Sequence, residues 1–111
     1  MSSSRFKPGT IVLTPFPFSD LSQVKKRPAL IVAEESPNSV ILVFISSRKS
    51  ATKNKYSISI NSDELNNLKT VAYVRCGKIA TVHKSIIIGK IGELSKKDLE
   101  LVLKTIRNIF F

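Results

Sequence analysis

The stretch RPALIVAEESPNSVILVFISS, residues 27–47, contains two apolar runs that decide the fold. The first, RPALIVA, is a short continuous apolar run of the kind that forms a buried strand. A turn at Ser36, Pro37 and Asn38 separates it from the second run, SVILVFI, which predicts another strand. Both runs are far shorter than the roughly 18 apolar residues of a membrane span, so they indicate strands of a folded sheet.

Further β-rich segments lie on both sides of this stretch. The Ile-Val-Leu content of residues 10–15 predicts a strand, closed by the prolines of PFPF, which cannot donate ladder hydrogen bonds. Three more strands are expected at YSISI (56–60), TVAYVR (70–75) and SIIIGKIGEL (85–94). Gly89 permits a bulge or bend in the last of these. Asn61, with Glu64 three residues later, predicts the cap of a short helix that ends near Leu68.

The end of the sequence predicts an amphipathic helix. Ser95 has the position of an N-cap with Asp98 three residues later, and Leu94 and Leu99 are spaced as a hydrophobic staple. The apolar face of this helix contains Leu99, Val102, Leu103, Ile106 and Ile109. We therefore expect residues 1–111 to form a single α+β domain, a small curled antiparallel sheet with a C-terminal helix packed on it.

The charge of the chain is strongly unbalanced. Eighteen Lys and Arg against eight Asp and Glu give a formal net charge of +10, which favours a polyanion such as RNA, DNA or an acidic protein. Between Ser36 and Gly92 the only carboxylates are Asp63 and Glu64, so the positive surface lies in the middle of the chain. The alternative is that these side chains only keep the protein soluble.

Several classes of site are disfavoured by what the sequence lacks. Cys76 is the only cysteine, so neither an intramolecular disulfide nor a cysteine metal cluster can form, and a reducing cytoplasm is the expected location. There is no phosphate-binding Gly-rich motif, no pair of suitably spaced carboxylates and no hydrophobic signal segment. His83 has no second His or Cys nearby in sequence, so we expect it to be structural or exposed and not a metal ligand. Taken together, these absences lead us to expect no metal, no cofactor and no membrane partner.

The remaining chemistry is phosphate handling by Arg, Lys and hydroxyl groups. RNA can be cleaved by its own 2′-hydroxyl, so a protein need only orient that group and stabilise the charge on the phosphate. Arg27 presents a fork of donors that matches two phosphate oxygens, although a guanidinium is a poor proton donor. Ser46 or Ser47, at the end of the second apolar run, offers a hydroxyl to the same phosphate.

Three ordered blocks then identify a relative. IVLTPFPFSDLSQVKKRPALIV (11–32), VFISS (43–47) and VAYVRCGKIATVHKSIIIGKIGELSKKDLELVL (71–103) resemble the MazF/PemK family of toxin endoribonucleases from bacterial toxin-antitoxin systems. The resemblance implies an SH3-like barrel with a C-terminal helix, a homodimer, and metal-independent cleavage of single-stranded RNA. It also implies 2′,3′-cyclic phosphate and 5′-hydroxyl products, and an antitoxin whose acidic segment occupies the RNA groove.

The resemblance also assigns roles to residues. Arg27 matches the Arg of the family's [KR]RP motif and Ser46 the Thr of its ITS motif, and these two form the catalytic pair. The sequence departs from the family pattern at Ser46 itself and at three further positions, Gln23, Gly77 and His83. The expected groove lies between the loop before Arg27, the stretch SSRKSATKNK and the edge near Arg75. Its substrate-binding residues would be Asp20, Lys25, Lys26, Ser47, Arg48, Lys49, Lys53 and Arg75.

Two other functions stay open at this level. A CcdB-like toxin has the same architecture but poisons DNA gyrase, and it would need no chemistry at Arg27. A non-catalytic SH3-like module would hold RNA with a salt-dependent affinity and leave it intact. The basic middle of the chain favours a nucleic-acid target over gyrase.

Overall fold

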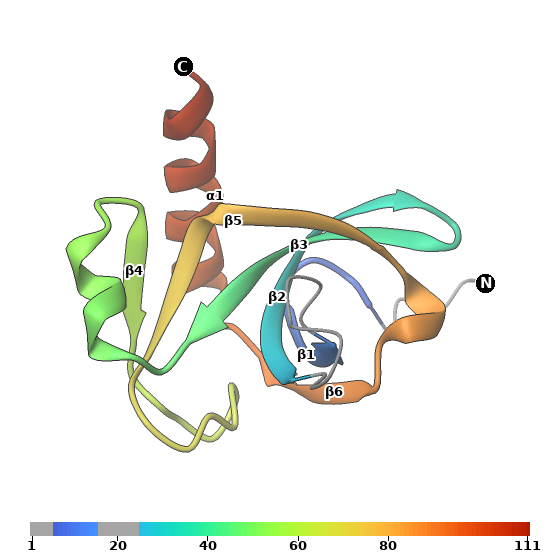
Figure 1. The fold of residues 1–111 in the computed structure, drawn as a ribbon, viewed down its shortest axis with the longest axis horizontal. Coiled ribbons are helices and arrows are strands. Elements are labelled where there is room, and N and C mark those ends of the chain that lie inside the picture. Colours follow the sequence, from blue (N-terminus) through green and yellow to red (C-terminus); the bar gives the residue numbers. More distant parts are fainter. Residues whose placement is uncertain (1–5, 16–24) are drawn as a thin grey trace.

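A computed structural model describes residues 6–15 and 25–111. Its strands are β1 (Thr10–Pro15), β2 (Lys26–Ser36), β3 (Ser39–Ser46), β4 (Ser57–Ile60), β5 (Ala72–His83) and β6 (Gly89–Glu93). They form one antiparallel sheet in the order β4-β5-β3-β2-β1-β6. The sheet curls without closing, and helix α1 (Lys96–Phe110) lies against it (Figure 1). The expected curled antiparallel sheet with a C-terminal helix is confirmed.

The hairpin of β2 and β3 lies at the centre of the sheet, as its two apolar runs predict. Both strands have neighbours on each side, and both faces of the hairpin are covered, which explains why the runs are continuous. One hydrophobic cluster includes Leu30, Val43, Val74 and Val102 and lies under α1. The cluster on the other face includes Ala29, Ile31, Leu42 and Phe44.

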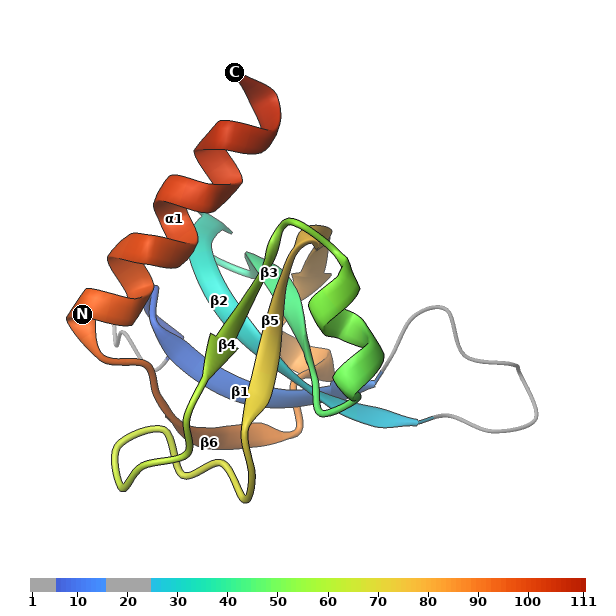
Figure 2. The same cartoon turned by 90° about the vertical axis from the view of Figure 1, so that its left-hand side faces the viewer.

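The C-terminal helix follows the sequence prediction closely. Ser95 is the N-cap, and its Oγ accepts a hydrogen bond of 3.2 Å from the backbone N–H of Asp98. Val102 is fully buried, and Leu99, Ile106 and Ile109 pack against the same cluster. The helix covers one side of the curled sheet (Figure 2). Among the residues described here, no helix combines the length and apolarity needed to cross a membrane.

Two strand predictions are wrong in their boundaries. Residues 70–75 contain only the start of β5, and residues 85–94 are not one strand, because a short 3-10 helix, η2 (Lys84–Ile86), precedes β6. His83 explains the interruption, since its Nδ1 accepts a hydrogen bond of 3.1 Å from the backbone N–H of Ser85 and caps η2. His83 is exposed and has this structural role, as expected.

The helix predicted from Asn61 to Leu68 does not form. Asn66 is buried, and its Oδ1 accepts hydrogen bonds of 3.0 Å from the backbone N–H groups of Asp63 and Leu68. These side-chain bonds replace the helical ladder, because Asn and Asp compete for backbone groups in turns. The segment is therefore a turn, and Glu64 does not take part in a capping box.

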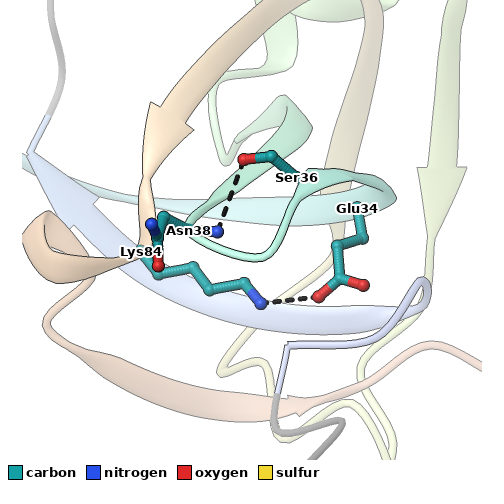
Figure 3. Close-up of polar contacts among 4 residues, drawn as sticks. All are labelled: Glu34, Ser36, Asn38 and Lys84. Carbon is teal, nitrogen blue, oxygen red and sulfur yellow. Dashed lines mark hydrogen bonds and ion pairs between the residues drawn. The ribbon is translucent and has the colours of Figure 1, made fainter. Parts of the chain in front are cut away.

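The far end of the β2–β3 hairpin is tied to η2. Lys84 Nζ lies 2.6 Å from Glu34 Oε2, and the backbone N–H of Lys84 donates a hydrogen bond of 2.7 Å to Asn38 O. Figure 3 shows the Lys84 side chain reaching Glu34, with Ser36 accepting a hydrogen bond from Asn38 beside them. These contacts hold the hairpin end that is remote from Arg27 and Ser46.

Candidate nucleic-acid interface

Arg27 and Ser46 come from neighbouring strands and meet at one end of the central hairpin. In the β2–β3 ladder Ala29 pairs with Phe44, and continuing this antiparallel register by two residues places Arg27 opposite Ser46. Both side chains are partly buried, and both line a pocket of about 180 Å³. A guanidinium and a hydroxyl therefore line one small pocket that is open to solvent.

This smaller pocket is strongly basic. Its described lining consists of Arg27, Phe44, Ile45, Ser46, Arg48, Arg75 and Lys78. Four of these side chains are cationic, and no carboxylate is among them. Several positive charges that line one small pocket attract an anion together. The attraction is stronger where the pocket walls exclude part of the water. The arrangement suits a phosphate group, whose oxygens accept from Arg forks and hydroxyls.

The hydroxyl of Ser46 is held in place by the chain that follows it. Its Oγ accepts a hydrogen bond of 3.1 Å from the backbone N–H of Arg48, just past the end of β3. A serine hydroxyl has one donor and two acceptor positions, so this bond leaves the O–H proton for another acceptor. Ser46 can therefore donate to a phosphate oxygen while its own position is fixed from behind.

A bulge in β5 brings two further cations into the pocket. Val43 pairs with Ile79 but Phe44 pairs with Arg75, so three residues of β5 have no partner on β3. Such a bulge bends a strand and redirects its side chains. Arg75, which pairs just before the bulge, and Lys78, the last of its three unpaired residues, both line the smaller pocket. Sequence reasoning included Arg75 but missed Lys78, because a bulge depends on pairing with another strand.

A larger groove of about 1100 Å³ adjoins the smaller pocket, and Arg27, Ile45 and Arg48 line both spaces. Its wall at the sheet includes Leu13, Pro28, Ile45 and Ala72. The remaining described lining consists of Lys25, Lys26, Ser47, Asn67, Leu68, Lys69, Thr70, Lys90 and Ile91. The groove is thus a basic and partly apolar trough that is continuous with the Arg27 side chain.

One cation of the larger groove has an acidic partner. Lys90 Nζ lies 2.7 Å from Glu93 Oε2, and this contact lowers the pKa of the Glu93 carboxyl below its usual value. Lys7 adds a smaller effect in the same direction. Glu93 is on the surface, so the pair is weak and Lys90 can turn to another anion.

The structure brings most of the predicted site residues together. Arg27 and Ser46 line the smaller pocket with Arg48 and Arg75, and the larger groove adds Lys25, Lys26 and Ser47. Lys49 and Lys53 lie on the 3-10 helix η1 (Lys49–Lys53) and line neither space. Asp20 and Gln23 lie outside the described residues.

Residues 67–70, Lys78 and Lys90 line the site without having been singled out for it. Lys69, Lys78 and Lys90 belong to the basic middle of the chain, which was the signal available. No signal in the sequence indicated that Asn67 and Thr70 belong to the site, because a polar residue in a turn is expected on any protein surface. Their place in the groove depends on how the β4–β5 loop folds.

Comparison with solved structures defines the class of fold. An endoribonuclease in complex with its cognate antitoxin, from a mycobacterial species, has a TM-score of 0.70 at 13% identity, covering 97% of this chain and 95% of that chain. The Mycobacterium tuberculosis toxin MazF-mt6 has a TM-score of 0.68 at 21% identity, with coverage of 91% and 95%. The chain therefore has the curled-sheet fold of these toxins.

Comparison of the sequence with protein-family models identifies the family. The family model described as PemK-like, MazF-like toxin of type II toxin-antitoxin system matches residues 7–110. The chain belongs to this family of toxins. A search among curated proteins found no match.

Proposed function

We propose that this toxin is a metal-independent endoribonuclease that cuts single-stranded RNA at short sequence motifs. One observation carries the proposal: Arg27 and Ser46 line the same small basic pocket, and Arg27 also lines the adjoining groove of about 1100 Å³. The family assignment and the mycobacterial endoribonuclease of similar fold support it. The single toxin domain expected over residues 1–111 is part of this proposal.

The proposed reaction uses a nucleophile that the substrate provides. The ribose 2′-oxygen attacks the adjacent phosphorus, the bond from phosphorus to the 5′-oxygen breaks, and a 2′,3′-cyclic phosphate and a 5′-hydroxyl result. Arg27 donates to the non-bridging oxygens, where negative charge increases in the transition state. Ser46 donates a hydrogen bond to the same phosphate and fixes its orientation.

The proton balance of this step points to a role for Lys78. The 2′-hydroxyl loses one proton and the departing 5′-oxygen gains one, and a guanidinium is a poor proton donor because it keeps its charge at any ordinary pH. Lys78 is the only lysine among the described residues of the smaller pocket, and an ammonium group releases a proton more easily than a guanidinium. We assign Lys78 the protonation of the leaving oxygen, and water the removal of the 2′-hydroxyl proton.

The partners follow from the charge of the groove. We propose that the larger groove binds the RNA strand and that the acidic segment of a cognate antitoxin competes for the same cations. Carboxylates and phosphates are alternative anions for one set of Lys and Arg side chains. A homodimer and a cytoplasmic location complete the proposal, which the family assignment supports.

The test is cleavage of mixed-sequence single-stranded RNA by purified protein in the presence of EDTA. We expect cuts at a recurring short motif, with 5′-hydroxyl ends and 2′,3′-cyclic phosphates. Arg27→Ala should remove the activity and keep the fold, whereas the matched Arg107→Ala variant on α1 should cut normally. Salt-dependent RNA binding without new ends would favour the non-catalytic module, and full activity of Arg27→Ala would remove Arg27 from the mechanism.

A further inference from the structure

Residues 61–70 of the β4–β5 loop are built around the buried side chain of Asn66. Asn66 is 1% exposed, and besides the two hydrogen bonds that its Oδ1 accepts, its Nδ2 donates one of 2.9 Å to Asn61 O. The backbone N–H of Asn66 donates one of 2.7 Å to Asp63 Oδ1. A buried amide that makes three hydrogen bonds favours one loop conformation, because rearranging the loop would leave these polar groups unpaired.

The same loop is fixed to β6 by backbone contact. The backbone N–H of Glu93 donates a hydrogen bond of 3.0 Å to Leu65 O, and Asn67 Nδ2 donates one of 3.1 Å to Ile91 O. A Cβ on Gly92 would lie 2.4 Å from the carbonyl oxygen of Asn66, so only glycine allows this approach. Figure 2 shows the loop beside β6.

The position of this loop sets one wall of the larger groove. Residues 67–70, which follow Asn66, line the groove together with Lys90 and Ile91 of β6. Leu13 and Pro28 line it from strands β1 and β2. The two hydrogen bonds to β6 and the Gly92 contact therefore determine how far this wall stands from the rest of the site.

We propose that the loop of residues 61–70 is a preformed base-selecting wall, which chooses the RNA sequence next to the phosphate held at Arg27. The proposal rests on the endoribonuclease function above. The smaller pocket is lined mainly by cations, which position a phosphate but carry no sequence information. Residues 67–70 offer instead an amide, a hydroxyl, an ammonium and an apolar side chain.

Fixed donors and acceptors are what base recognition needs. Sequence-specific reading of single-stranded RNA uses hydrogen bonds to base edges together with apolar or stacking contacts. A group on a loop that is already ordered discriminates better, because little conformational freedom is lost when the correct base binds. Asn66 and Gly92 are positioning residues in this scheme, while Leu68, Lys69 and Thr70 are the candidates for contact with the bases.

The main experiment compares two glycines of the same strand. Gly92→Ala places a methyl group against the Asn66 carbonyl and displaces the wall, whereas Gly89→Ala meets nothing within 4 Å and serves as the control. Each variant is incubated with mixed-sequence RNA and its 5′ ends are mapped. For Gly92→Ala we expect the preference for the wild-type motif to fall about tenfold, the loss expected for one base contact, with cuts at other sequences continuing. Gly89→Ala should keep the wild-type motif.

A second pair of variants covers the case in which Gly92→Ala does not fold. Lys69 is exposed and lines the groove, and Lys69→Ala should broaden or shift the cleavage motif, as expected for a specificity contact. Lys104→Ala, the same change on α1, should do neither. If a folded Gly92→Ala variant and the Lys69→Ala variant both cut at the wild-type motif, the proposed base-selecting wall is wrong, although the nuclease function still holds. Absence of cutting by the wild-type protein would overturn both.

Discussion

At the scale of single residues, the site depends on Arg27, which with Arg48 borders two basic spaces. Arg27 lines the smaller pocket and the larger groove, so its side chain can hold a phosphate whose neighbouring nucleotides extend away from it. The sequence motif KRP identified this residue, and strand register explains why Ser46 is its neighbour. Residues fixed by β2 and β3 were predictable because both strands are strongly apolar and continuous.

Arg27→Lys tests whether the fork of donors matters beyond its charge. Lysine keeps the positive charge but cannot make two parallel hydrogen bonds to a phosphate. We expect kcat to fall by about 100-fold, the usual loss for one transition-state donor, with a much smaller change in KM. Single-turnover and steady-state cleavage rates measure this. Equal kcat values for the two proteins would show that Arg27 contributes only general electrostatic attraction.

Cys76 gives a prediction about pH. Burial raises the pKa of its thiol to about 11, so the folded protein holds this proton while an unfolded chain loses it near pH 9.0. The unfolded state then binds fewer protons than the folded state, and stability must fall as pH rises from about 9 to 11. The Cys76→Val variant has no thiol to titrate, so its free energy of unfolding should not show this decrease between about pH 9 and pH 11. Denaturant unfolding of both proteins at pH 8 and pH 10.5 tests it, and an identical pH dependence would contradict it.

At the scale of elements, local signals predicted α1 and long-range contacts decided the rest. The cap at Ser95 and the apolar face around Val102 are close together in sequence, so the helix could be predicted. The bulge of β5 that admits Lys78 depends on β3, and the fold of residues 61–70 depends on β6. A capping pattern at Asn61 therefore predicted a helix where buried Asn66 makes a turn.

Asn66→Ala tests the turn that replaced the predicted helix. The substitution leaves the N–H groups of Asp63 and Leu68 and the carbonyl of Asn61 without their partner. Because the loop can partly relax toward water, we expect a loss of about 2–3 kcal/mol in the free energy of unfolding. Asn108→Ala, on the exposed side of α1, should change it by less than about 0.5 kcal/mol. Equal stabilities in denaturant titrations would mean that the Asn66 bonds contribute nothing.

At the scale of the whole molecule, much of the positive charge of this +10 chain lies along the two spaces. Eight described Lys and Arg side chains line one or both of them: Lys25, Lys26, Arg27, Arg48, Lys69, Arg75, Lys78 and Lys90. Composition alone predicted a polyanion partner, but only the fold shows that these cations share one face. Lys49 and Lys53, equally basic in sequence, lie elsewhere.

This concentration of charge predicts a strong salt dependence of RNA binding. If four or five phosphates are neutralised, the logarithm of the binding constant should fall with the logarithm of salt concentration at a slope of about −3. Binding of Arg27→Ala to a non-cleavable 2′-deoxy strand should reduce the slope by about 0.7, the value for one phosphate contact on a single strand. Titration at several salt concentrations measures both slopes, and a slope near zero would exclude an electrostatic groove.

The central claim is that Arg27 and Ser46 grip a phosphodiester while the neighbouring ribose attacks it. The most direct test is an RNA oligonucleotide with a single 2′-deoxy position immediately 5′ of the mapped cut. We predict that this strand binds as tightly as the all-ribose strand and is not cut at that position, while a 2′-deoxy substitution two nucleotides away has little effect on the cutting rate. Cleavage of the modified strand at the normal rate would require another nucleophile and would contradict the account.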